Sequence, residues 1–240
     1  MAMTRRALIA GGAATHVARS WSQDAAVDPG LRGASAGLVA DALRAAGVDP
    51  RAQTLATDMK RMTRPGAPVA GPAVTTKWEP ARGEPMAQDA IRRFLFEPID
   101  EAPAGAMWVV ESGTDQLLSM FGDLIALGCK KRGMAGAVTD SGCRDVAAMD
   151  RAGFPVFAKG AVLYGPGAVI RPVAANVPVR CGGVAIEPGD IVVADNDGVI
   201  VVPKAHLEAV REATEVLQAK EAEVRRRIED GEPLARAYTL

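Results

Sequence analysis

The chain has little of the material that several common kinds of active site require. Its 240 residues include only two histidines, His16 and His206, so a three-histidine metal site or a serine–histidine–aspartate relay has almost nothing to draw on. The cysteines Cys129, Cys143 and Cys181 are odd in number and form no Cys-x-x-Cys pair, which argues against a disulfide framework and a structural zinc site. Chemistry in this protein must therefore use carboxylates, arginine, backbone amides and, where one is bound, a metal.

An excess of charge and a long apolar segment are also missing. The 28 basic and 29 acidic side chains nearly cancel, so no extended surface for nucleic acid is expected. No apolar run reaches the roughly 18 residues that a membrane-spanning helix needs. With 48% hydrophobic and 24% charged residues, the composition is that of a globular protein with enough apolar surface for a core.

The first residues resemble a twin-arginine export signal. The pair Arg5 and Arg6 precedes a weakly apolar Gly/Ala stretch, and Arg19 and a polar segment follow. Residues 1–28 are therefore set apart as a leader or an N-terminal extension, and residues 29–240 as the folded domain. A functioning leader implies export to the periplasm. If the arginine pair is only a common dipeptide in an extension, the protein stays in the cytoplasm.

Hydrophobic periodicity and turn chemistry predict one mixed α/β domain followed by a helical tail. Ser35 is expected to cap a helix that ends at Gly47. The clearest helix runs from Lys204 to about Ile228, with a thin apolar stripe suited to a surface or to another subunit. Its arginine run at 225–227 is interpreted as a solvated face, because glutamates are interleaved. The expected strands are 73–76, 107–110, 136–139, 155–158, 177–179, 184–186, 191–194 and 199–202, with helices at 124–132 and 145–152.

Three glycine-containing segments are assigned to structure and not to a ligand. The segment 165–167 lacks a third glycine and carries a proline where a phosphate loop needs a free amide. The segment 195–198 resembles the start of a calcium loop, but no glutamate follows at the required distance, so we interpret it as a hairpin turn. Gly182 and Gly183 are interpreted as a bend between strands.

Two segments carry the candidate chemistry. The first opens a helix at Gly122, so the amides of its first turn form an anion site. The second is the turn 140–142 at the end of a buried strand, which delivers Arg144 and Asp145 to the edge of the sheet where ligands bind. An arginine can clamp a carboxylate and an aspartate can hold a hard divalent cation, although the two can equally form a salt bridge at a helix start. The amides are those of Gly122, Asp123, Leu124 and Ile125.

An ordered set of motifs extends from about Gly30 to Gly231. In chain order the motifs are Gly71-Pro72-Ala73-Val74-Thr75, Gly122-Asp123-Leu124, Arg132-Gly133-x-x-Gly136, Asp140-Ser141-Gly142-Cys143-Arg144-Asp145, Gly153-Phe154-Pro155-Val156-Phe157 and Pro188-Gly189-Asp190-Ile191-Val192-Val193-Ala194-Asp195-Asn196-Asp197-Gly198-Val199. Together they resemble the RraA-like family, which comprises 4-hydroxy-4-methyl-2-oxoglutarate aldolases and regulators of ribonuclease E activity.

The resemblance implies a fold, an assembly and a site. Residues 29–240 are expected to form a single α/β/α layered domain of the swivelling, phosphohistidine-domain-like type with a C-terminal helix, assembled as a homotrimer or a dimer of trimers. In the aldolases of the family, the matching amides of Gly122 through Ile125 and the side chain of Arg144 bind the pyruvyl group. The carboxylate matching Asp145 holds the divalent metal. Arg144 and Asp145 are thus the expected catalytic pair.

The sequence departs from the family's aldolase signature at one position. That signature continues Arg-Asp-x-x-Glu/Asp, whereas this chain has Ala148 there and its nearest acid at Asp150. The missing carboxylate would help to hold the water shell of the metal, so both metal affinity and natural substrate are open.

Two functions of different classes follow. The first is a lyase that uses Mg²⁺ or Mn²⁺ and acts on a small 2-oxo acid, either by retro-aldol cleavage of a 4-hydroxy-4-methyl-2-oxoglutarate-type substrate to pyruvate or by decarboxylation of oxaloacetate. The alternative is a non-catalytic regulator that binds an RNase E-like endonuclease and needs neither the metal nor Asp145. Neither function involves direct binding of nucleic acid or of a membrane.

Overall fold

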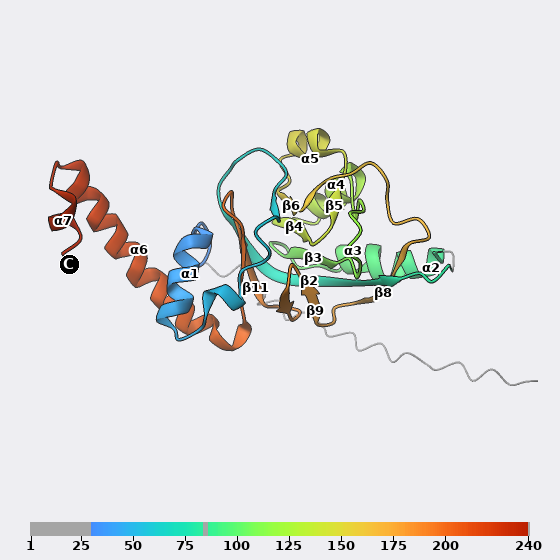
Figure 1. Ribbon diagram of the computed structural model, residues 1–240, viewed down its shortest axis with the longest axis horizontal. Helices are drawn as coiled ribbons and strands as arrows, with labels where there is room; N and C mark the ends of the chain where they lie inside the picture. The colour runs from blue at the N-terminus through green and yellow to red at the C-terminus, as the bar shows by residue number, and fades with distance from the viewer. Residues whose placement is uncertain (1–29, 84–85, 240) are drawn as a thin grey trace, which may run out of the picture.

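The computed structural model describes residues 30–83 and 86–239 (Figure 1). The twin-arginine-like segment 1–28 lies outside these residues, so its role as an export leader stays a prediction. The helices are α1 (Ala36–Ala45), η1 (Pro50–Ala52), α2 (Gln88–Ile91), η2 (Arg92–Phe96), α3 (Glu97–Asp100), α4 (Asp123–Lys131), α5 (Val146–Ala152), η3 (Lys204–His206), α6 (Leu207–Glu229) and α7 (Leu234–Ala237). The strands are β1 (Lys60–Arg61), β2 (Val69–Pro80), β3 (Met107–Glu111), β4 (Gly136–Thr139), β5 (Gly142–Cys143), β6 (Val156–Ala158), β7 (Gly160–Ala161), β8 (Ile170–Ala175), β9 (Val179–Cys181), β10 (Val184–Ile186), β11 (Ile191–Ala194) and β12 (Val199–Val202).

A mixed eight-stranded sheet forms the centre of the fold. Seven of its strands follow the order β1-β6-β4-β3-β2-β11-β12, and β8 pairs with the second half of the long strand β2. The strands β2, β3, β4 and β6 are parallel to one another, and the remaining pairings are antiparallel. In β3 the run from Met107 to Val110 is buried throughout, as expected of a parallel strand that is covered on both faces.

The two faces of the sheet are covered differently. Because side chains alternate along a strand, Val74 and Trp108 face the core beneath α4 and α5, whereas Ala73 and Met107 face the opposite side. That opposite side is covered by the hairpin β9–β10, whose alternating apolar residues form one face. The expected α/β/α layering is therefore wrong for this face, because the hairpin lies where a second layer of helices was expected. The mixed α/β class with a C-terminal helix is confirmed, and the swivelling type stays a prediction.

Local signals place most elements where the sequence indicates them. The hydroxyl Oγ of Ser35 accepts a hydrogen bond from the amide of Leu38 at 3.1 Å and so caps α1. Helix α4 ends just before Gly133, which adopts a positive φ of 76° that favours glycine. Strand β8 and the helical stretch 88–100 lie outside the elements expected from the sequence.

Two of the three glycine-containing segments are confirmed as turns between strands. Gly182 and Gly183 connect β9 to β10. In the turn between β11 and β12, Oδ1 of Asp195 accepts a hydrogen bond from the amide of Asp197 at 2.9 Å. Oδ2 of Asp195 accepts another from the amide of Ala36 at 2.8 Å, so this carboxylate ties α1 to the sheet and is not available as a calcium ligand.

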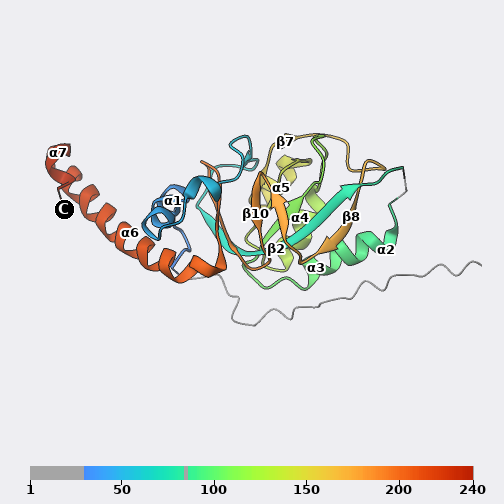
Figure 2. The same ribbon diagram turned by 60° about the horizontal axis from the view of Figure 1, so that its bottom comes forward.

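The C-terminal helix α6 begins against α1 and then extends away from the sheet (Figure 1). Figure 2 shows α6 from another side, again extending away from the sheet, with α7 at the outer end of α6. Its buried residue Val210 packs in one apolar cluster with α1, Thr214 and Val224 are also buried, and Val216 is exposed. Within residues 30–83 and 86–239, no helix is long and apolar enough to cross a membrane.

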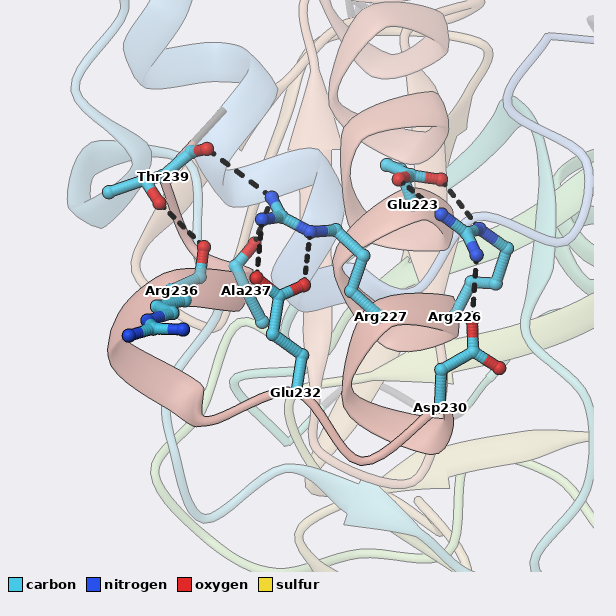
Figure 3. A network of polar contacts seen from close by, with 8 residues as sticks. All are labelled: Glu223, Arg226, Arg227, Asp230, Glu232, Arg236, Ala237 and Thr239. Carbon is cyan, nitrogen blue, oxygen red and sulfur yellow. Dashed lines mark hydrogen bonds and ion pairs between the residues drawn. The ribbon is translucent and has the colours of Figure 1, made fainter.

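The arginines near the end of α6 are neutralised by neighbouring acids (Figure 3). Arg226 donates to both carboxylate oxygens of Glu223 at 2.9 and 2.8 Å and to Asp230 at 2.7 Å. Arg227 donates to both oxygens of Glu232 at 2.6 and 2.8 Å. Arg226 is exposed, as the interpretation of a solvated face requires, whereas the side chain of Arg227 is only 19% exposed and also donates to the carbonyl of Ala237 at 3.1 Å.

Candidate active site

A pocket of about 570 Å³ opens where the chain leaves strands β3 and β4, within the size range typical of small-molecule sites. It brings together all six residues that the sequence assigned to the site. It also contains residues from η2, α3 and the middle of α4 to which the sequence pattern assigned no role. The lining residues are Leu95, Phe96, Ile99, Asp100, Gly122, Asp123, Leu124, Ile125, Gly128, Arg144 and Asp145.

Backbone pairing brings the two predicted segments side by side. The segment after β3 runs parallel to β5, because the amide of Gly142 donates to the carbonyl of Leu118 at 2.9 Å and the amide of Met120 donates to the carbonyl of Gly142 at 2.9 Å. The amide of Arg144 then donates to the carbonyl of Phe121 at 3.1 Å. Gly122 and Arg144 are therefore neighbours in space although they lie far apart in the sequence.

A buried serine and a half-buried aspartate hold the turn before Arg144 in place. The hydroxyl Oγ of Ser141 accepts from the amide of Leu118 at 2.9 Å and lies 3.0 Å from the carbonyl oxygen of the same residue. Asp140 accepts from the amide of Ser112 at 2.8 Å, and burial raises the pKa of this carboxyl group. Both residues are thus supports of the turn, and the side chains that reach the pocket come from the residues that follow.

Asp145 presents its carboxylate to the pocket instead of capping the next helix. It adopts a left-handed conformation with φ of 57°, and its backbone carbonyl accepts from the amides of Ala148 and Met149 to begin α5. Its Oδ2 lies 3.5 Å from Nε of Arg144, and the two side chains are 44% and 53% exposed. A contact this long and exposed contributes little to stability, so a ligand can compete for both groups.

Gly122 leaves the space that the carboxylate of Asp145 occupies. A Cβ atom at position 122 would lie 2.5 Å from Oδ2 of Asp145 and 3.2 Å from Cγ of Arg144. Among the residues that the structure describes, no side chain caps the start of α4, so its first amides stay available to an anion. The glycine is therefore required by the close approach of the two segments.

We expect Gly122→Ala to remove activity without unfolding the protein. The added methyl group would push away the end of a flexible side chain, and residue 122 has extended backbone that alanine readily adopts. Substrate turnover should fall at least about tenfold, while the melting temperature stays close to that of the wild type. Gly37→Ala, in α1 outside the pocket, is the control, because a Cβ atom there would meet only Oγ of Ser35 at an ordinary distance of 3.9 Å, and it should leave turnover intact.

Asp150, the acid nearest to Ala148 in the sequence, is hydrogen-bonded to Arg64. Asp150 accepts hydrogen bonds from the backbone amide of Arg64 at 2.8 Å and from its Nε at 2.6 Å, and these bonds lower the pKa of Asp150. Asp150 therefore does not replace the acid that Ala148 lacks. The described part of the chain holds no cluster of three or more histidine, cysteine, aspartate or glutamate side chains suited to a metal.

The cysteine next to the site is not a nucleophile. Cys143 is fully buried, and burial raises the pKa of its thiol to about 12. The thiol is therefore protonated at neutral pH and inaccessible to a substrate. The polar groups of the pocket are Arg144, Asp145, the amides at the start of α4 and the carboxylates of Asp100 and Asp123.

The apolar wall of the pocket was not predicted from the sequence. It comes from α3 and from η2. The helix η2 is a π-helix, in which the backbone N–H of Glu97 donates a hydrogen bond to the carbonyl oxygen of Arg92. Such π-turns recur at functional sites. The available signal was the run of Phe94, Leu95 and Phe96 in a chain that has only 4% aromatic residues.

A family model and a similar sequence identify the family of this chain. The family model described as RraA-like (Aldolase/RraA) matches residues 37–201. A provisionally named 4-hydroxy-4-methyl-2-oxoglutarate aldolase from Halalkalibacterium halodurans is 34% identical over 175 residues, which is 71% of this chain and 76% of that protein.

Solved structures support the same fold. The crystal structure of Streptomyces coelicolor RraAS2, described as an unusual member of the RNase ES inhibitor RraA protein family, has a TM-score of 0.65 at 28% identity and covers 80% of this chain and 92% of that chain. An uncharacterized protein from Pseudomonas syringae pv. tomato has a TM-score of 0.71 at 22% identity, covering 90% of this chain and 94% of that chain, which shows the fold alone.

Proposed function

The chain belongs to the RraA-like family, and from this premise we propose that it is a metal-dependent lyase that releases pyruvate from a 2-oxo acid. The reaction is retro-aldol cleavage of a 4-hydroxy-4-methyl-2-oxoglutarate-type substrate, decarboxylation of oxaloacetate, or both. One observation carries the proposal. The pair Arg144 and Asp145 lines the same pocket as the uncapped start of α4, although these two segments lie far apart in the sequence.

The residues of the pocket fit a hard divalent cation such as Mg²⁺ or Mn²⁺. These ions need one or two protein carboxylates and take their other ligands from water and substrate oxygens, whereas zinc prefers several nitrogen or sulfur ligands. Asp145 offers one accessible carboxylate that is not used as a helix cap. When bound, the cation supplies a Lewis acid that polarises the 2-oxo group of the substrate.

The chain's own groups bind the substrate and stabilise the charge that develops on it. The guanidinium of Arg144 binds the carboxylate of the pyruvyl group, and the first amides of α4 donate to its oxygens. As the C3–C4 bond breaks, negative charge grows on the pyruvyl oxygen close to these donors, which lowers the barrier. Within the described residues no histidine lines the pocket, so water carries the proton from the 4-hydroxyl and the proton that C3 gains.

The proposal is tested by an assay of pyruvate release. Purified protein is incubated with 4-hydroxy-4-methyl-2-oxoglutarate or with oxaloacetate, in the presence of Mg²⁺ or Mn²⁺, and pyruvate is measured with time. We expect release that depends on both enzyme and metal. No turnover of either substrate across several divalent metals would count against the lyase.

The second candidate is a non-catalytic regulator of an RNase E-like endonuclease. It is favoured by the likeness to RraAS2, whose description names an RNase ES inhibitor family, and by Ala148 in place of the family's acid. Such a regulator would act through a surface of a homotrimer or a dimer of trimers, for which the exposed part of α6 is suited. A stoichiometric complex with the endonuclease, together with no pyruvate release, would support it over the lyase.

Restoring the acid at position 148 is expected to tighten metal binding. In Ala148→Glu the new carboxylate would stand one helical turn after Asp145, where the family's aldolase signature places an acid. Titration calorimetry with Mn²⁺ should give a dissociation constant at least several-fold lower than that of the wild type. Ala147→Glu, at the exposed neighbouring position of α5, adds the same charge and should change the constant much less. Equal effects of the two variants would show a general charge effect and contradict the assignment.

A further inference from the structure

A buried serine lies between the two segments that form the site. Ser141 stands in the turn after β4, and it is only 1% exposed. Its hydroxyl Oγ accepts a hydrogen bond from the amide of Leu118 at 2.9 Å. The same Oγ lies 3.0 Å from the carbonyl oxygen of Leu118 and 3.2 Å from that of Gln116, to either of which it can donate. One side chain thus bonds both donor and acceptor groups of the segment that leads to Gly122.

The hydroxyl takes the place of a backbone acceptor. In a parallel ladder, the N–H and C=O groups of one residue bond to the two residues that flank its neighbour on the other strand. The carbonyl of Leu118 follows this pattern, because it accepts from the amide of Gly142 at 2.9 Å. The pattern would pair the amide of Leu118 with the carbonyl of Asp140, but Oγ of Ser141 accepts this bond instead. The pairing of the two segments therefore begins with a bond to a side chain and continues through the backbone.

The two segments have little room to shift at the pocket. A Cβ atom at position 122 would lie 2.5 Å from Oδ2 of Asp145 and 3.3 Å from Nε of Arg144. The groups that line the pocket therefore come from segments that nearly touch. A misplacement of catalytic groups by about 1 Å can lower a rate by about 100-fold. The position of one segment relative to the other is thus a quantity on which catalysis depends.

These contacts do not depend on how copies of the chain assemble. Leu118 and Ser141 are 2% and 1% exposed within a single chain. Each hydrogen bond between the two segments joins residues of the same chain. A partner subunit that covers the pocket would therefore leave the bonds of the Ser141 hydroxyl unchanged.

We propose that Ser141 is a positioning residue, whose hydroxyl fixes the first amides of α4 relative to Arg144 and Asp145. This inference rests on the proposed lyase function. The substrate in its ground state can adjust to the groups of each segment in turn, whereas the transition state requires both segments at once. The cation needs the carboxylate of Asp145 alone. Loss of the hydroxyl should therefore lower turnover much more than it weakens binding of substrate or metal.

Ser141→Ala, which removes only the hydroxyl, tests the inference. In the assay of pyruvate release with Mg²⁺, kcat should fall at least about tenfold, with a smaller change in KM. The dissociation constant of Mn²⁺, measured by titration calorimetry, should stay close to that of the wild type. Thr75→Val is the matched control, because the buried Oγ1 of Thr75 donates to the carbonyl of Val177 at 2.6 Å outside the pocket. The control should lower the melting temperature to a similar extent and leave kcat near the wild-type value.

The outcomes separate this inference from the lyase function. If the wild type releases pyruvate and Ser141→Ala keeps its kcat, or loses no more of it than Thr75→Val, the positioning role is wrong and the lyase stands. If the wild type releases no pyruvate, the lyase fails, and amide hydrogen exchange measured by mass spectrometry decides on Ser141. Peptides that span residues 118–122 and 142–145 should then exchange faster in Ser141→Ala than in the wild type and in Thr75→Val. Unchanged exchange at 142–145 overturns the coupling of the two segments.

Discussion

Asp145→Ala is expected to abolish metal-dependent pyruvate release while the protein stays folded. Asp145 is the only side chain that we assign directly to the cation, and water ligands do not replace its charge. Its contact with Arg144 is 3.5 Å long and half exposed, so its loss should change the free energy of unfolding by less than about 1 kcal/mol. Pyruvate release and the melting temperature are measured on the same sample.

The control for this variant removes an exposed aspartate far from the pocket. Asp41 in α1 accepts from Nη1 of Arg44 at 2.6 Å, and both side chains are exposed. Asp41→Ala should leave pyruvate release unchanged. If Asp145→Ala behaves in the same way and keeps full turnover, the pair of Arg144 and Asp145 is only a salt bridge at a helix start.

Arg144→Lys is expected to lower kcat/KM by about 100-fold or more. Lysine keeps the positive charge but loses the planar, two-pronged contact with the substrate carboxylate. The backbone bond from residue 144 to the carbonyl of Phe121 remains, so the loop should keep its position. The melting temperature should therefore stay close to that of the wild type, and initial rates over a range of substrate concentrations give kcat and KM separately.

The size of the fall in kcat/KM shows whether Arg144 acts through its two-pronged contact or through its charge alone. A fall of less than about tenfold in kcat/KM would mean that positive charge alone is sufficient. Such a result would contradict the bidentate contact and would leave the first amides of α4 as the main binding groups. Arg151→Lys is the matched control, because Arg151 is an exposed residue of α5 outside the pocket. It should not affect either constant.

The parts of the fold that were predictable depend on short-range signals. Ser35 caps α1 through a bond to a residue only three positions away, and Gly133 ends α4 through its own backbone preference. The positions of Arg144 and Asp145 followed from the turn after a buried strand, because ligand sites of such sheets lie at the strand ends. All these inferences use information contained within a few residues.

The parts that were not predictable depend on partners distant in the sequence. Strand β8 exists because it pairs with the second half of β2, and the hairpin β9–β10 covers a face for which helices were expected. The role of Asp150 depends on Arg64, which lies 86 positions away. The apolar wall from η2 reaches the pocket only after the sheet has brought α3 beside α4. Local sequence patterns do not predict these pairings between distant residues.

Removal and return of the metal on one preparation tests the proposed site most directly. The wild type and Asp145→Ala are treated with a chelator, dialysed, and assayed for pyruvate release before and after addition of Mg²⁺ or Mn²⁺. We expect the chelated wild type to be inactive and to recover its turnover when the metal returns, whereas Asp145→Ala stays inactive throughout. Full turnover of the chelated wild type, or equal recovery in both proteins, would contradict a metal-dependent lyase site at Arg144 and Asp145.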